Sequence, residues 1–157
     1  YLAIYTAMNL GAFAVIIALS RKTGSAEVSS FGGAFSYAPG LTVAMTIFLF
    51  SLAGIPPLGG WFAKFEVFRV LATAGEPWGY VLAVVAAVNA VIALYYYAAV
   101  LLKMWAEDAP EGEHLPVPFT PSLVSALAIC GAVTLLFGVV PQVVARFTHV
   151  SLLALGG

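Results

Sequence analysis

The sequence has very few charged residues and a single cysteine. Of its 157 residues, 8% are charged and 62% are hydrophobic, whereas a soluble domain carries about 25% charged residues. So few charges cannot cover a water-facing surface, which excludes an ordinary soluble domain. Cys130 has no second cysteine for an internal disulfide, and within an apolar run a lone thiol behaves as a small hydrophobe.

Several functional signatures are also missing. The formal net charge is -1, whereas a nucleic-acid-binding protein needs clustered Lys and Arg, so we expect no nucleic-acid partner. There is no phosphate-binding loop, zinc-ligand cluster or dinucleotide fingerprint, so we expect this chain itself to bind no metal ion and no cofactor. The chain starts at Tyr1 inside an apolar run, without an initiator methionine or a signal peptide. We therefore expect it to be part of a longer protein.

Long apolar runs dominate the sequence instead. The mean hydropathy is +1.04, and the runs approach the roughly 20 residues that cross a ~30 Å hydrocarbon layer. We predict an all-α integral membrane protein with about four transmembrane helices, over residues 1–20, 41–75, 78–104 and 122–140. Between them lie a Gly/Ser-rich connector, 23–39, and a polar, proline-rich loop, 106–121.

The second predicted span, 41–75, contains a helix-breaking segment. Pro56 and Pro57 remove backbone donors, and Gly59 and Gly60 permit non-helical dihedral angles. The apolar halves on either side would each reach only ~21 to 24 Å, too short to span alone. They form either two short spans joined by a tight turn at the surface, or one long span interrupted near the membrane midplane. The lengths favour the interrupted span, whose unpaired backbone groups line a hydrated cavity or are buried in protein.

Lys64 lies about one helical turn after the break, near the bilayer midplane in an interrupted span. An ionisable group there costs several kcal/mol and by default marks transport or proton relay. Glu66 and Arg69 are spaced to pair with each other, whereas Lys64 points away from Glu66. Desolvation favours a neutral lysine and a nearby carboxylate or water favours the charged form, so a lysine here can exchange protons. If the break were a surface turn, Lys64 would instead extend to the interface, as we expect of Arg69.

Other polar residues in or near the spans have structural explanations. Asn9 lies mid-span, where we favour an interhelical hydrogen bond over a direct role in a proton path. The Tyr95–Tyr97 cluster is typical of the interfacial aromatic belt. The carboxylates of 106–121 could form a metal site with His114, but the prolines among them favour a solvated loop. We interpret His149 as an interfacial residue.

The basic residues predict a topology. With four spans, the second one broken, Arg21, Lys22 and Lys103 fall on one side of the membrane and Arg146 on the other. The positive-inside rule then places the Arg21–Lys22 end and the acidic loop in the cytoplasm. Five spans would separate Arg21 and Lys22 from Lys103, so the charges favour the broken span.

Two segments carry a resemblance to a known family. They are Met-Asn-Leu-Gly-Ala-Phe at 8–13 and Ser-Leu-Ala-Gly-Ile-Pro-Pro-Leu-Gly-Gly-Trp-Phe-Ala-Lys-Phe at 51–65. The chain resembles the C-terminal third of subunit N of bacterial respiratory complex I, the proton-translocating NADH-quinone oxidoreductase. The second motif is similar to that of multisubunit cation/proton antiporters as well. Trp61 precedes Phe62 here, a departure that leaves Lys64 in register.

The resemblance implies a larger antiporter-like subunit, of which this chain would supply the last four helices. It implies that the broken span is a discontinuous helix and that Lys64 is the proton carrier ending the proton path. We take Asn9, Thr46, Gly59 and Gly60 as residues of the proton path or its support. The NADH, flavin and iron–sulfur chemistry would belong to partner subunits, and quinone would be bound by the complex rather than by this chain. The partners would be other membrane subunits and the lipid bilayer, in a bacterial inner membrane that the chain crosses several times.

Two alternatives stay open. One is a subunit of a multisubunit sodium/proton antiporter, in which cation exchange rather than electron transfer drives movement, although residues 8–13 favour complex I. The other is a purely structural membrane subunit in which Lys64 belongs to a satisfied ion pair. That alternative predicts that neutralising Lys64 damages assembly rather than turnover.

Overall fold

In the computed structural model, which describes residues 1–73, 75–109, 117–140 and 142, every regular element of the described residues is a helix. This confirms the predicted all-α class. The elements in chain order are α1 (Leu2–Thr23), the 3-10 helix η1 (Val28–Phe31), α2 (Ala34–Tyr37), α3 (Pro39–Ala53), α4 (Gly59–Thr73), α5 (Pro77–Ala106) and α6 (Pro121–Val139). By length and composition α1, α5 and α6 could each cross a membrane, and α3 is a shorter apolar helix.

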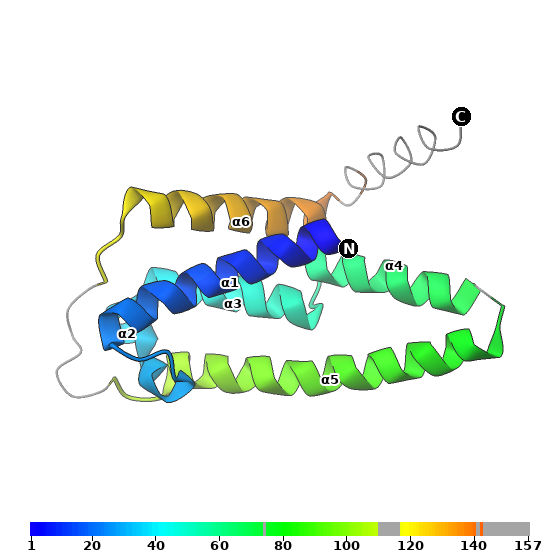
Figure 1. Ribbon diagram of the computed structural model, residues 1–157, viewed down its shortest axis with the longest axis horizontal. Coiled ribbons are helices and arrows are strands. Elements are labelled where there is room, and N and C mark those ends of the chain that lie inside the picture. The colour runs from blue at the N-terminus through cyan, green and yellow to red at the C-terminus, as the bar shows by residue number, and fades with distance from the viewer. Residues whose placement is uncertain (74, 110–116, 141, 143–157) are drawn as a thin grey trace.

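The long helices run roughly along one common axis (Figure 1). α1 packs against α6 and α3, α3 packs against α5, and α4 contacts both α6 and α5. α3 and α4 follow one another along the length of α5, so the loop between them falls partway along that helix rather than at its end. Each half has 15 residues. The structure therefore has the interrupted arrangement that the short apolar halves predicted.

The core is formed mainly between α1 and α3. Buried apolar residues recur at helical spacing along both helices, at Ile4, Met8, Val15, Leu19, Leu41, Met45, Phe48 and Leu52. A side chain at Gly11 would overlap the ring of Phe48, so this glycine allows the two helices to approach closely. By contrast, the most apolar 18-residue window of α5 has no buried residue. Such a large apolar surface is suited to lipid or to neighbouring helices rather than to water.

Prolines and capping groups define where the long helices begin and end. Pro39, Pro77 and Pro121 each stand in the first turn of a helix, where a missing N–H removes no helical hydrogen bond. The hydroxyl of Thr120 accepts a hydrogen bond from an amide in the first turn of α6. α3 ends at Gly54, whose φ of 90° lies in the left-handed region that glycine tolerates. The break after Ala53 is thus encoded in the sequence itself.

The Gly/Ser-rich connector after α1 is more structured than its composition predicted. Phe31 and Tyr37 are buried, and the ring of Phe35 stacks on Trp105 with centroids 4.3 Å apart. The Gly33 N–H donates a hydrogen bond to the carbonyl of Lys103. The small residues permit the turns, and the aromatic residues between them supply the apolar contacts that anchor η1 and α2 to the bundle.

The positions of the basic residues agree with a broken second span. The C-terminal ends of α1, which carries Arg21 and Lys22, and of α5, which carries Lys103, lie at the same end of the molecule (Figure 1). His114 and the neighbouring glutamates of the acidic loop, and Arg146 and His149 of the tail, lie outside the described residues. Their placement in a solvated loop and at an interface therefore stays a prediction.

Candidate functional site

Lys64 extends from the second turn of α4 toward the end of α3. Its Nζ donates a 2.9 Å hydrogen bond to the main-chain carbonyl of Ala53, the last residue of α3. A helical carbonyl accepts from an N–H three or four residues later, and for Ala53 these positions are Pro56 and Pro57, which have no N–H, so the Ala53 oxygen is left to the lysine. The carbonyl end of a helix carries a partial negative charge that favours a cation. The Lys64 ammonium therefore caps the C-terminus of α3.

No carboxylate among the described residues forms an ion pair with Lys64. The nearest acidic residue along the chain, Glu66, is held by Arg69 in a 2.7 Å ion pair, which confirms the predicted Glu66–Arg69 pair and leaves Lys64 with a carbonyl partner instead. Lys64 itself is half-buried. The site thus holds one cation against a helix end, without a neutralising anion in the described part of the chain.

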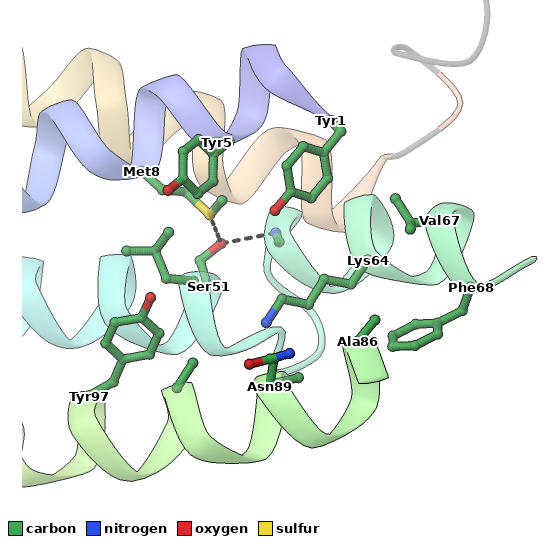
Figure 2. Close-up of a pocket in the computed structure, with 14 residues that line it drawn as sticks. Tyr1, Tyr5, Met8, Ser51, Lys64, Val67, Phe68, Ala86, Asn89 and Tyr97 are labelled. Carbon is green, nitrogen blue, oxygen red and sulfur yellow. Dashed lines mark hydrogen bonds between the residues drawn. The ribbon is translucent and has the colours of Figure 1, made fainter. Parts of the chain in front are cut away.

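The Lys64 side chain also lines a cavity of about 490 Å³ between α1, α3, α4 and α5. The other lining residues with polar side chains are Tyr1, Tyr5, Ser51, Asn89 and Tyr97. Figure 2 shows the end of the Lys64 side chain directed toward Asn89 of α5. A cavity of this size with several hydrogen-bonding side chains can hold a group of water molecules. Water in it would contact the Lys64 side chain, which lines the cavity.

The two glycines predicted at the site lie where the start of α4 closely approaches neighbouring helices. A Cβ atom at Gly60 would overlap the main-chain carbonyl of Ser51, and the Gly60 N–H donates a 3.0 Å hydrogen bond to the Ser51 hydroxyl. A Cβ atom at Gly59 would stand 2.9 Å from the carbonyl of Thr134 in α6. Gly60 lines the Lys64 cavity and Gly59 does not. Both glycines let the start of α4 pack against neighbouring helices.

Asn9 and Thr46 lie outside the Lys64 cavity. The amide of Asn9 donates to the carbonyl of Tyr5 within the same helix, at 2.8 Å, so the predicted interhelical hydrogen bond is not formed among the described residues. A helical Asn can reach the carbonyl four residues earlier, which gives its amide a local partner. The Thr46 hydroxyl donates to the Thr42 carbonyl and accepts from the indole N–H of Trp105 at 3.0 Å. Thr46 thus ties α3 to α5.

The residues on the α5 side of the cavity were not predicted from the sequence. Tyr97 lines the cavity, whereas its neighbours Tyr95 and Tyr96 are 72% and 62% exposed, so of the three tyrosines only Tyr97 faces this cavity. Asn89, Ala93 and Tyr97 all line the cavity and recur every four residues, the spacing of one helical face. That spacing was the available signal. In the described residues no group of three His, Cys, Asp or Glu side chains could hold a metal ion.

Comparison with known proteins agrees with this geometry. Residues 1–90 match the family described as NADH:quinone oxidoreductase/Mrp antiporter, TM. The whole chain is 44% identical to NADH-quinone oxidoreductase subunit N 1 of Koribacter versatilis, over 30% of that protein's length. It is 39% identical over its whole length to NADH-quinone oxidoreductase subunit N of Chloroflexus aggregans, covering 31% of that protein. A third relative, NADH-quinone oxidoreductase subunit N of Granulibacter bethesdensis, is 43% identical over 90% of this chain and 29% of its own length.

The chain spans about 30% of the length of these curated relatives. The family match covers more than half of the chain and includes α1, the broken pair α3 and α4, and Lys64. The resemblance inferred from the motifs at 8–13 and 51–65 is therefore confirmed. This chain belongs to the NADH:quinone oxidoreductase/Mrp antiporter transmembrane family.

Proposed function

We propose that this chain is part of the proton-translocating membrane subunit of a NADH-quinone oxidoreductase, in which Lys64 carries the proton. The observation that supports this role is the placement of Lys64, at a helix break and beside a polar cavity, without a carboxylate partner among the described residues. A charge removed from water in this way marks transport more often than packing. The names of the relatives support the assignment of this chain to a NADH-quinone oxidoreductase.

The proposed chemistry at Lys64 is a proton exchange on Nζ. As an ammonium, Lys64 is attracted to the carbonyl end of α3 and donates to Ala53. When Nζ gives up its proton, the charge that holds it at the helix end is lost, and the amine is free to turn toward the cavity that Asn89 and Tyr97 line. Water in the cavity is the proton's immediate source and acceptor.

The same proposal assigns the remaining parts of the reaction to other chains. NADH, flavin and the iron–sulfur clusters belong in partner subunits, and quinone is bound by the complex rather than by this chain. The exposed apolar face of α5 suits contact with lipid or with other membrane subunits of the complex. The bacterial inner membrane is the proposed location, with α1, α5 and α6 among the membrane-crossing helices.

The test is proton pumping and NADH-quinone turnover in inverted membrane vesicles that carry variants of the full-length subunit, with assembly measured on the same sample. Lys64→Ala should abolish pumping in a fully assembled complex. Lys64→Arg should also block pumping but keep the cap on Ala53, because a guanidinium retains its proton. Arg69→Ala is the matched control, since Arg69 is a cation of the same helix that is 61% exposed.

The outcomes separate the proposal from its alternatives. Normal pumping with either Lys64 variant would exclude Lys64 as the carrier. Failed assembly of Lys64→Ala, with normal assembly and pumping of Lys64→Arg, would favour a structural subunit. A sodium/proton antiporter, which the family description also covers, would exchange sodium for protons in vesicles without NADH. The NADH-quinone oxidoreductase proposal expects Lys64-dependent pumping only when NADH and quinone are supplied.

A further inference from the structure

Ser51 departs from the usual behaviour of hydroxyl residues inside a helix. Serine and threonine side chains commonly bond to a main-chain carbonyl three or four residues earlier, and Thr42 and Thr46 of the same helix do so. Ser51 is completely buried, yet its hydroxyl donates to the sulfur of Met8 in α1 at 2.7 Å. It accepts from the Gly60 N–H of α4 at 3.0 Å. One buried hydroxyl therefore joins three helices.

The bond from Gly60 closes one end of the helix break. Gly60 is the second residue of α4, so its N–H has no partner within its own helix. Ser51 satisfies it as a capping residue would, although Ser51 lies in a different helix. On the other side of the break, Lys64 of α4 satisfies the Ala53 carbonyl at the end of α3. The two half-helices thus cap one another.

The two caps depend on each other through geometry. Lys64 follows Gly60 by about one helical turn, so the distance from α4 to the end of α3 sets whether Nζ can reach the Ala53 oxygen. That distance is set by the Ser51–Gly60 hydrogen bond and by the contact of Gly60 with the Ser51 carbonyl. The Met8 sulfur accepts the hydrogen bond of the Ser51 hydroxyl, which leaves the oxygen lone pairs of Ser51 free to accept from Gly60.

We propose that Ser51 is a positioning residue for Lys64: its hydroxyl holds the start of α4 against the end of α3, so that Lys64 reaches the Ala53 carbonyl in each cycle. This inference rests on the proposed role of Lys64 as proton carrier. The Ser51–Gly60 bond joins two uncharged groups, so it persists when Lys64 gains or loses a proton. The Ser51–Gly60 bond is therefore the fixed cap of the break, whereas the Lys64–Ala53 bond changes with the proton on Lys64.

The experiment compares Ser51→Thr with Ser51→Val in the full-length subunit of the assembled complex. Threonine and valine have nearly the same shape, and only threonine keeps the hydroxyl, so any strain from the added methyl group is common to both. The rate of proton pumping should fall roughly tenfold for valine, the order by which the population of the aligned conformation falls when a buried N–H loses its partner. Threonine should retain at least about half of the wild-type value. Ser51→Ala should behave as valine does.

Assembly of the complex is measured for every variant and should stay normal. Equal pumping of the threonine and valine variants, whether high or low, would overturn the inference, because the hydroxyl would then have no role. Loss of assembly that threonine restores would overturn it too, since the hydroxyl would be structural. Normal pumping of Lys64→Ala would refute the proposed function itself. Loss of pumping in Lys64→Ala with normal pumping in Ser51→Val would refute only the role of Ser51.

Discussion

Replacing Gly60 with alanine is the smallest change that should open the helix break. The added methyl group would overlap the main-chain carbonyl of Ser51, and a backbone atom cannot move aside as a flexible side chain can. The start of α4 must then shift away from α3. Overpacking of this kind costs about 1 to 3 kcal/mol, and the shift also breaks the hydrogen bonds of Ser51 and Lys64 across the break, each contributing about 1 kcal/mol.

We therefore expect Gly60→Ala to destabilise the subunit by roughly 3 to 5 kcal/mol and to lower proton pumping. The assay is heat-induced aggregation of the detergent-solubilised complex, followed by size-exclusion chromatography, with pumping measured in vesicles. Gly131→Ala in α6 is the matched control, because among the described residues nothing lies within 4 Å of a Cβ atom there. If both variants had the same aggregation temperature and the same pumping, the close contact between α3 and α4 would have no energetic importance.

Two further changes test contacts outside the site. Trp105→Phe removes the 3.0 Å hydrogen bond to Thr46 but keeps an aromatic ring to stack on Phe35. It should therefore cost about 1 kcal/mol in stability and leave pumping unchanged. A pumping defect would mean that this contact acts on the proton path. Glu66→Gln breaks the exposed ion pair with Arg69, which should change stability by less than about 1 kcal/mol. A larger loss of stability, seen as a lower aggregation temperature, would show that Glu66 has a partner beyond Arg69.

The sequence predicted the helix break and the position of Lys64 beside it, because both depend on residues that are rare in an apolar span. Two prolines and two glycines within five residues, followed by Lys64, allow few arrangements in a membrane. The predicted Glu66–Arg69 pair followed in the same way from helical spacing.

The sequence could not show which polar groups would meet across helices. Ser51 is an ordinary helix residue by composition, and its role depends on Met8 and Gly60, which other helices bring to it. Tyr97 could not be separated from Tyr95 and Tyr96 because the rotation of α5 against α3 and α4 decides which ring faces the cavity. Local pattern fixes a helix and its breaks, whereas the neighbours of each face depend on packing between distant segments.

A helix break inside a membrane is stable only if the backbone groups that it frees find partners. Within the loop itself, the amides of Gly54, Ile55, Leu58 and Trp61 bond to nearby carbonyls. The Gly60 N–H and the Ala53 carbonyl then receive the side chains of Ser51 and Lys64. A serine and a lysine thus satisfy one freed amide and one freed carbonyl of the break. Because one of these two partners is a titratable cation, the same bond that stabilises the break also gives it a state that changes with a single proton.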